Sequence, residues 1–410
     1  MRVAEVFATA IGDTAKFRGY DGSEAGSAEA QVQVTINTPD ALTHLVRAPG
    51  GLGLARAYIG GDLTVDGPLY DALRALQVDG VKEASWAERV SLLKAVGMAA
   101  TRRVRPPEEE VRLHGRRHSK ARDAEAIAHH YDVSNRFYEW VLGPSMAYTC
   151  AVYPEIDSSL EEAQHSKFDL VARKLGLTAG MRLLDVGCGW GGMVIHAAKH
   201  YGVKGLGVTL SRQQAEYAQK AIADAGLADL AEVRFLDYRD VTDGEFDAIS
   251  SIGLTEHIGK AQQPEYFRFL YGKLKPGGRL LNHCITRPDS HQKTMERNGF
   301  INRYIFPDGE LVPPGYIVTT MHDAGFEVRH LDDFREHYAM TLRDWCANLE
   351  THWDEAVAEV GERTAKIWML YMAGSRLGFE RNQIELHQVL GVKLSDNGVS
   401  GMPLLPAFTR

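Results

Sequence analysis

The feature that most constrains this chain is a glycine-rich turn at 181–192, Met-Arg-Leu-Leu-Asp-Val-Gly-Cys-Gly-Trp-Gly-Gly. An apolar run ends at Val186, four glycines follow within six residues, and an amphipathic segment begins at Met193. This pattern predicts a strand, a tight turn and the start of a helix. Glycine suits such a turn because it adopts positive φ and leaves the backbone open, while the helix start offers unpaired N–H donors. The turn therefore favours a nucleotide-like ligand at the end of a parallel strand.

The alternation of strands and helices continues beyond the turn. Strands are expected at 182–186, 204–210, 231–236, 246–252 and 279–285, with helices at 193–201, 212–225 and 263–274. Later strands are expected at 325–331 and 383–393, and a mostly helical stretch at 341–378. Such alternation predicts an α/β fold with a doubly wound, mostly parallel sheet. The aromatic and irregular residues 287–320 are expected to form a lid.

The length of 410 residues exceeds the usual limit of one hydrophobic core, so more than one domain is expected. Residues 1–99 show the short strands and helices of a smaller α+β domain, without a recognisable catalytic cluster. A linker at 100–123 is rich in arginine, and Pro106-Pro107 prevents a continuous helix through it. It is either a solvated hinge or a contact with an anionic membrane surface. Residues 124–410 are expected to form the large domain that carries the glycine turn.

Composition excludes several functions. The net charge of −8 argues against general nucleic-acid binding. The four cysteines are far apart and no Cys/His spacing typical of zinc is present, so free thiols and no metal site are expected. No stretch reaches the ~18 apolar residues of a membrane span, and the N-terminus lacks a signal-peptide pattern. The chain is therefore expected in the cytoplasm, at most peripheral at the inner face of the membrane.

Polar side chains follow the successive strands of the expected sheet. Because the carboxyl ends of parallel strands converge on one cleft, these groups are expected to share a site. They include Asp185, Thr209, Gln214, Asp237, Glu256 and His283. Each alone has an ordinary explanation as a cap, a turn or a core residue. An acid that would hold the ribose of a dinucleotide is missing after the second strand, at 208–211, which argues against NAD.

Six segments in order give a more specific resemblance, to the cyclopropane fatty acid synthase family of S-adenosylmethionine-dependent methyltransferases. They are HYDVSNRFY at 130–138, MAYTCA at 146–151, LDVGCGWG at 184–191, VTLSRQQ at 208–214, IGLTEHIG at 252–259 and LNHCI at 281–285. The resemblance spans about 120–392. The additional N-terminal domain resembles that of the longer, phospholipid-acting members, where it serves membrane binding or dimerisation.

The resemblance implies roles for individual residues. Those matching positions that hold the methyl donor are Tyr148, Gly187, Gly189, Thr209, Leu210, Gln214, Asp237 and Tyr238. Those matching positions around a bicarbonate ion are Cys150, Gly253, Glu256, His283 and Tyr338. One departure is Thr255, where a phenylalanine is common in the family.

The implied reaction is methyl transfer from S-adenosylmethionine to the cis double bond of an unsaturated phospholipid acyl chain. The transfer leaves a carbocation, which aromatic faces stabilise, and a base must then remove a proton. The first expected product is a cyclopropane ring. The alternative is a methylene branch, the precursor of 10-methyl fatty acids such as tuberculostearic acid, which needs a separate reductase. More distant alternatives are a small-molecule methyltransferase and a lipid-binding protein. A homo-oligomer stays open.

Overall fold

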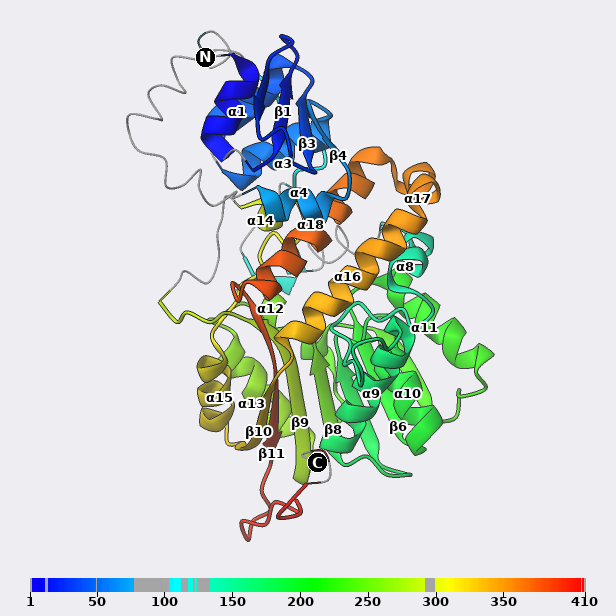
Figure 1. The fold of residues 1–410 in the computed structure, drawn as a ribbon. Coiled ribbons are helices and arrows are strands. Elements are labelled where there is room, and N and C mark those ends of the chain that lie inside the picture. Colours follow the sequence, from blue (N-terminus) through cyan, green and yellow to red (C-terminus); the bar gives the residue numbers. More distant parts are fainter. Residues whose placement is uncertain are drawn as a thin grey trace. The chain divides into compact units, whose positions relative to one another are not determined.

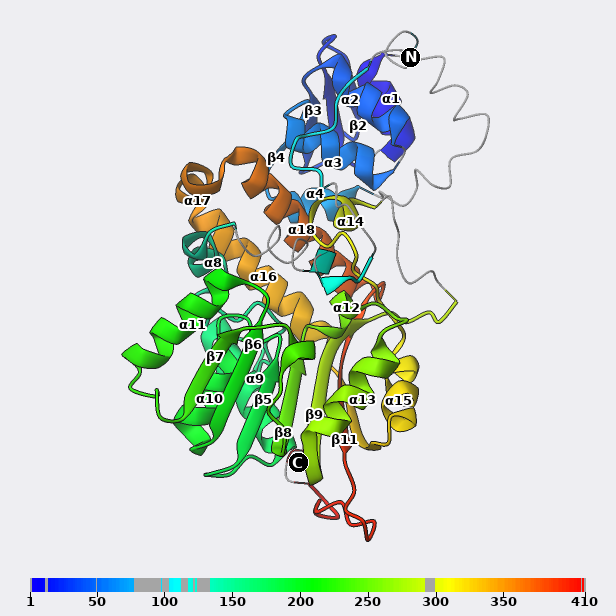
Figure 2. The ribbon, with the colours of Figure 1, turned by 180° about the vertical axis from the view of Figure 1, so that it is seen from behind.

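The computed structural model describes residues 2–11, 14–48, 50–76, 97, 103–111, 117–120, 122–123, 133–291, 299–406 and 408. The chain divides into two compact units (Figures 1 and 2). The first comprises 1–112, 296–307 and 352–377, and the second comprises 113–295, 308–351 and 378–410. The sequence pattern places everything after residue 123 in the large domain. The division differs because two later segments join the N-terminal unit.

The first unit contains a four-stranded sheet in the order β2-β1-β3-β4. Its strands are β1 (Lys16–Gly19), β2 (Glu24–Gly26), β3 (Gln33–Ile36) and β4 (Leu63–Asp66). Its helices are α1 (Val3–Ile11), α2 (Pro39–Arg47), α3 (Gly51–Gly60), α4 (Leu69–Ala75), α14 (Phe300–Tyr304), α17 (Trp353–Val360) and most of α18 (Glu362–Glu380). Phe7 and Phe17 pack in its core with Val34 and Leu42. The α+β character expected of the N-terminal segment is confirmed.

The second unit is built on a seven-stranded sheet in the order β10-β11-β9-β8-β5-β6-β7. The strands are β5 (Arg182–Val186), β6 (Lys204–Thr209), β7 (Ala231–Phe235), β8 (Phe246–Ile252), β9 (Leu274–Thr286), β10 (Glu327–Asp333) and β11 (Glu385–Val392). β5 to β9 pair in parallel, whereas β11 runs antiparallel to β9 and β10. The expected doubly wound, mostly parallel sheet is therefore confirmed, with one reversed strand.

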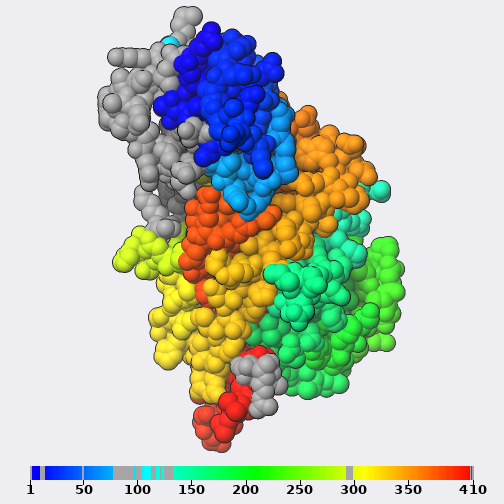
Figure 3. Space-filling model, in the orientation of Figure 1, coloured from blue at the N-terminus to red at the C-terminus, as the bar shows by residue number. Residues whose placement is uncertain are grey.

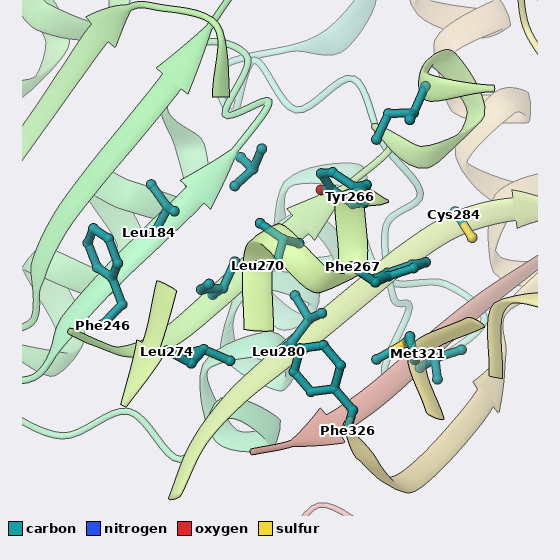
Figure 4. Close-up of a cluster of buried hydrophobic side chains, with 14 of the residues drawn as sticks. Leu184, Phe246, Tyr266, Phe267, Leu270, Leu274, Leu280, Cys284, Met321 and Phe326 are labelled. Atoms are coloured by element: carbon teal, nitrogen blue, oxygen red, sulfur yellow. The ribbon is translucent and has the colours of Figure 1, made fainter. Parts of the chain in front are cut away.

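Both faces of this sheet are covered, as the near-continuous apolar strands require. On one face Leu183, Ala248 and Leu281 pack in a cluster with α9 (Leu160–Leu175) and α10 (Gly192–Tyr201). Their chain neighbours Leu184, Ile249 and Leu280 point to the opposite face, because side chains alternate along a strand. There they meet α13 (Gln263–Lys273) and α15 (Pro314–Asp323), as Figure 4 shows for part of the cluster. The strand ends are thereby held in a fixed arrangement.

The segment 287–320 corrects an expectation, because it is not irregular throughout. Residues 300–304 form α14, which belongs to the first unit, and α15 begins at Pro314 in the second. Proline is tolerated at the first position of a helix, so Pro313-Pro314 starts this helix rather than excluding one. Ile317 and Met321 of α15 are buried in the core of the second unit. Residues 292–298 lie outside the described residues.

The C-terminal segment after β11 projects from the second unit, where Figure 3 shows it in red. Val399, Leu404 and Leu405 in this segment are exposed. Within the parts of the chain that the structure describes, no helix combines the length and apolar character needed to cross a bilayer.

Helix α9 begins with a capping box, from which one prediction about stability follows. Ser159 Oγ accepts from the Glu162 backbone N–H at 3.3 Å, and the Glu162 carboxylate accepts from the Ser159 N–H at 2.9 Å. Ser159→Ala removes the first of these bonds, so we expect the free energy of unfolding to fall by ~1 kcal/mol. Urea denaturation measures this, and the neighbouring control Ser158→Ala removes only an exposed bond from the Glu155 N–H at 3.2 Å that lies outside the helix. An unchanged midpoint would contradict the capping role.

Candidate functional site

The glycine turn connects β5 to α10 in a left-handed backbone. The φ angles are +74° at Gly187, +54° at Gly189 and +83° at Gly191. A Cβ atom on Gly189 would meet no other heavy atom within 4 Å, so this position borders open space. A Cβ atom on Gly192 would lie 2.7 Å from the Phe168 ring of α9, so this glycine permits close helix packing. The turn thus needs glycine for two different reasons.

A pocket opens at this turn, within the second unit. Its walls include 146–149, part of α9 and the ends of β5, β6 and β8. Of the residues that sequence reasoning assigned to the donor and anion positions, it is lined by Tyr148, Gly187, Gly189, Thr209, Leu210, Gln214, Tyr238 and Gly253. The structure therefore brings together most of the candidate donor-binding residues, from segments far apart in the sequence.

Asp237 is not among the residues that line this pocket. Its carboxylate accepts from the Arg239 guanidinium at 2.8 and 2.6 Å, and from the Arg239 backbone N–H at 2.9 Å. It thereby caps the short 3₁₀ helix η2 (Tyr238–Asp240). Its neighbour Tyr238 does line the pocket, so donor binding by Asp237 itself stays a prediction.

Two buried charged residues also line the pocket: Asp185, which the strand-end pattern predicts, and Lys167, which the sequence analysis did not single out. Lys167 of α9 donates to Thr149 Oγ1 at 2.8 Å and lies 3.7 Å from the centre of the Phe168 ring. Burial lowers the pKa of Lys167 to about 7 and raises the pKa of Asp185 to about 6. Asp185 also accepts from Ser250 Oγ at 2.6 Å. The pocket lining thus contains one basic and one acidic side chain, and the pKa of each is shifted toward neutral pH.

Glu256 lies just after β8 in the short helix α12 (Thr255–Ile258), and its carboxylate is half satisfied. Oε1 accepts from the backbone N–H of Ile285 in β9 at 2.7 Å. Oε2 is buried and has no hydrogen-bond partner among the described residues. Burial raises the pKa of Glu256 to about 7, against the opposing effect of the Ile285 N–H. An unpaired buried polar atom of this kind fits a site for a further polar group.

His283 of β9 is the second half-satisfied group. Its Nδ1 lies 3.2 Å from Gln388 Nε2 of β11, and its Nε2 is buried without a partner in the described part of the chain. The Gln388 side-chain oxygen in turn accepts from Lys174 Nζ at 2.7 Å. Since the amide nitrogen of Gln388 donates, His283 Nδ1 must accept, and the ring proton resides on Nε2. Burial, with Lys167 and Lys174 adding to it, lowers the pKa of His283 and keeps the ring neutral.

Cys150 and Tyr338 lie in the same part of the second unit. Cys150 is fully buried, and its Sγ lies 3.1 Å from the Ala151 carbonyl oxygen and 3.8 Å from that of Phe334. The Tyr338 N–H donates to the same Phe334 carbonyl at the start of α16 (Arg335–Thr351). Burial raises the pKa of the Cys150 thiol, so it is protonated at neutral pH and acts as a hydrogen-bonding group rather than a nucleophile.

The predicted anion residues are thus adjacent to the pocket rather than on its surface. Gly253 alone lines the pocket, whereas Cys150, Glu256, His283 and Tyr338 are buried beside it. Gly253 joins the two regions, because its N–H donates to the His283 carbonyl at 2.8 Å and a Cβ atom added to it would lie 3.3 Å from Thr149 Cγ2. Lys167, which bonds to Thr149, also acts electrostatically on Cys150 and His283. Their roles remain predictions, but these contacts connect one continuous region.

Gln388 is a positioning residue for His283, and it makes a testable prediction. Gln388→Leu removes the donor that fixes the tautomer, while Lys174 keeps its bond to Asp332. We expect turnover to fall by about 10–100-fold, the range seen for outer partners of metal-bound histidines, with donor affinity unchanged. The control is Gln219→Leu, which removes a glutamine bond to the Val233 carbonyl. Equal turnover of the two variants would contradict the positioning role.

The functional residues that the sequence analysis missed are polar residues at positions where the local pattern predicts apolar ones. Lys167 and Gln164 are polar residues on the buried face of an amphipathic helix, and Gln388 interrupts an apolar strand. A buried polar group demands a partner, but the partner of Gln388 is Lys174, 214 positions away. Motif spacing cannot predict a pair of residues that are so far apart in the sequence.

Comparison with known proteins places this geometry in a family. The family model described as mycolic acid cyclopropane synthetase matches residues 118–389. A probable fatty acid methyltransferase of Mycobacterium tuberculosis is 53% identical, over 98% of this chain and 97% of that protein. A probable fatty acid methyltransferase of Pseudomonas putida is 39% identical, over 91% of this chain and 90% of that protein.

Solved structures give the same result. A cyclopropane synthase from Mycobacterium tuberculosis is 32% identical with a TM-score of 0.62, and the match covers 65% of this chain and 98% of that one. A mycolic acid cyclopropane synthase solved with S-adenosylhomocysteine is also 32% identical with a TM-score of 0.62, over 65% of this chain and 97% of that one. The chain belongs to the mycolic acid cyclopropane synthetase family and is an S-adenosylmethionine-dependent methyltransferase.

Proposed function

We propose that the protein transfers the methyl group of S-adenosylmethionine to the cis double bond of an unsaturated phospholipid acyl chain and forms a cyclopropane ring. One observation carries the proposal. Beside the candidate donor pocket, Glu256 Oε2 and His283 Nε2 are both buried without partners among the described residues. Relatives named as fatty acid methyltransferases and structures named as cyclopropane synthases support a lipid substrate.

The chemistry explains why such groups are needed. An alkene has no acidic proton to lose before methyl transfer, so positioning supplies the first step. The transfer breaks the sulfur–carbon bond, forms a carbon–carbon bond and leaves a cation on the neighbouring chain carbon. Ring closure then requires loss of one proton from the added methyl group. A bicarbonate ion, when bound, supplies a base for that proton.

The two half-satisfied side chains fit an anion. His283 carries its ring proton on Nε2, the atom without a partner, and therefore offers an N–H donor. Glu256, with a pKa near 7, exchanges a proton at neutral pH and offers an O–H donor when protonated. The Ile285 N–H fixes the other carboxylate oxygen, so the free one is held in place. In this proposal the hydroxyl of Tyr338 and the thiol of Cys150, whose Sγ lies 3.1 Å from the Ala151 carbonyl oxygen, complete the anion site.

A methylene-branched chain is the second candidate product. After methyl transfer, a hydride shift along the chain followed by loss of a methyl proton leaves an exocyclic methylene, for which a separate reductase is the partner. Thr255, at a position where the resemblance implies a phenylalanine, is the departure from the family pattern that bears on acyl-chain fit and on the fate of the cation. It is fully buried next to Glu256, and its hydroxyl lies 3.4 Å from Asn282 Oδ1. A smaller polar side chain there changes the surroundings of the cation.

Membrane contact or dimerisation, the alternatives expected of the N-terminal domain, is part of this proposal. The basic linker contributes less to it than its charge predicts. Arg117 pairs with Asp308 at 3.2 Å and Glu310 at 3.1 Å, and Arg122 pairs with Asp308 at 2.5 Å. Carboxylates of the second unit pair with these two arginines, which favours the hinge over lipid docking for Arg117 and Arg122. Arg102, Arg112 and Arg116 lie outside the described residues.

The proposal predicts the fatty acid profile of a host that lacks such an enzyme. On expression of this chain, unsaturated phospholipid acyl chains are expected to gain one CH₂ each. Because both products have the same mass, proton NMR of the methyl esters decides between upfield cyclopropane signals and olefinic methylene signals. Expression of Glu256→Gln at equal level is the control. An unaltered profile in cells containing folded wild-type protein contradicts a lipid substrate.

A further inference from the structure

Three histidines on two adjacent helices form a cluster in the second unit. His165 lies on α9, and His196 and His200 lie one turn apart on α10. One nitrogen from each ring lies within 4.8 Å of the other two. The ring centroids are 4.7 Å apart for His196 and His200, and 4.9 and 5.2 Å apart for the pairs with His165. The spacing of four residues places two imidazoles on one helix face, as in helical zinc sites.

We propose that His165, His196 and His200 form a binding site for a divalent transition metal, with Zn²⁺ the best match. The second observation is His196 Nε2, which is buried and has no hydrogen-bond partner in the described part of the chain. His196 itself is only 6% exposed. His196 packs against two further imidazoles, and a metal ion bound among the three rings would give its buried nitrogen a partner.

The surroundings favour a cation with nitrogen ligands. Neutral imidazole is the ligand form, and burial, with His200 and His165 adding to it, lowers the pKa of His196 to about 4. Asp169, one turn after His165, acts electrostatically on both His196 and His200. Its carboxylate accepts from Tyr201 Oη at 2.5 Å and Arg173 Nε at 2.8 Å, so it contributes charge rather than a free ligand atom. Three imidazoles leave a coordination position for water.

The liganding geometry requires only small movements. Zn–N bonds of about 2.0–2.1 Å place the nitrogens of a tetrahedral site about 3.4 Å apart. His165 and His200 are exposed, so rotation of their side chains closes the remaining gap around the buried His196. The sequence alone excluded a metal because His165 stands 31 positions before His196, and only the packing of α9 on α10 joins them.

A metal ion at this site would link α9 to α10, and both helices contribute residues to the candidate donor pocket. α9 supplies Lys167 and Phe168 to its lining, and α10 supplies Gly192 and Met193. A metal bound between the helices stabilises their packing, by an amount that grows with the logarithm of its affinity, because it binds only the folded arrangement. The inference stands independently of which lipid the enzyme modifies.

The test is titration of tag-free, EDTA-treated protein with Zn²⁺ by calorimetry, with Co²⁺ absorption as a second reading of ligand geometry. One Zn²⁺ per chain is expected. His165→Gln and His200→Gln, both at exposed positions, are each expected to weaken binding by at least about tenfold. His322→Gln, an exposed histidine of α15, is the matched control and should bind as wild type does.

A second measurement separates metal binding from misfolding. Zn²⁺ should raise the melting temperature of wild type and His322→Gln, and leave that of His165→Gln and His200→Gln unchanged. Binding of S-adenosylhomocysteine by all four proteins confirms that they are folded. Absence of Zn²⁺ binding at micromolar concentration overturns the site, and so does equal binding by all four proteins.

Discussion

Glu256→Gln is expected to lower turnover by about 10²–10⁴-fold, the loss typical of removing acid–base help. Donor affinity should stay within about a few-fold of wild type, because Glu256 does not line the candidate donor pocket. Glutamine keeps the oxygen that accepts from the Ile285 N–H, so local structure is preserved. It cannot take up or release a proton at the buried position that Oε2 occupies. Calorimetry with S-adenosylhomocysteine and single-turnover acyl-chain methylation measure the two effects separately.

The stability of the same variant gives an independent check with a definite sign. Burial raises the pKa of Glu256 from 4.5 to about 7 in the folded protein. Protonated Glu256 therefore contributes to the free energy of unfolding. This contribution is fully present below pH 4.5 and is lost as the pH rises through about 7. Glutamine stays neutral, so Glu256→Gln should exceed wild type in stability at pH 8, by at most ~3 kcal/mol, and approach it near pH 5. Urea denaturation at the two pH values tests this.

The combined result distinguishes catalysis from structure. If Glu256→Gln is inactive yet more stable than wild type at pH 8, the ionisable carboxyl of Glu256 serves function at a cost in stability. Near-normal turnover would remove Glu256 from the reaction. Loss of donor affinity would instead move the residue into the donor pocket.

Gly189→Leu is expected to abolish donor binding in a protein that remains folded. The position has φ of +54° and borders open space in the pocket, so the leucine side chain would occupy the volume that the methyl donor needs. Leucine is not branched at Cβ and therefore tolerates positive φ better than valine does. Calorimetry with S-adenosylhomocysteine should show no heat of binding at concentrations that saturate wild type.

Gly226→Leu is the matched control. Gly226 has φ of +68°, is also surrounded by open space and is exposed beyond the end of α11 (Arg212–Asp224), away from the pocket lining. Both variants impose the same kind of backbone strain, so their melting temperatures should fall by similar amounts. Equal donor affinity in the two variants would contradict the assignment of the glycine turn to the donor site.

Local patterns predict those parts of this molecule that depend on neighbouring residues. The strands from Arg182 to Ile252 appear within one residue of their expected ends, because their apolar runs are local signals, as are the glycines that follow β5 and β8. The candidate donor pocket follows from them, since parallel strands bring their ends to one edge. The cap of α9 is local in the same way, because Ser159 and Glu162 lie three positions apart in the sequence.

The remainder depends on contacts between distant residues. The joining of 296–307 and 352–377 to the N-terminal unit has no local signal. The Lys174–Gln388–His283 chain and the His165–His196–His200 cluster arise only when strands and helices pack. The buried residues Gln388 and His196 each interrupt an apolar pattern. This pattern marks the position as unusual but does not predict which residue is its partner.

The most direct test of lipid methylation uses the purified chain, S-adenosylmethionine labelled with ¹³C in its methyl group, and vesicles of dioleoyl phospholipid. Carbon NMR of the recovered acyl chains is expected to show the label in the bridging carbon of a cyclopropane ring. Label in an olefinic methylene carbon would select the second product while keeping the substrate. Acyl chains without label, recovered from protein that binds S-adenosylhomocysteine, would contradict methyl transfer to the double bond.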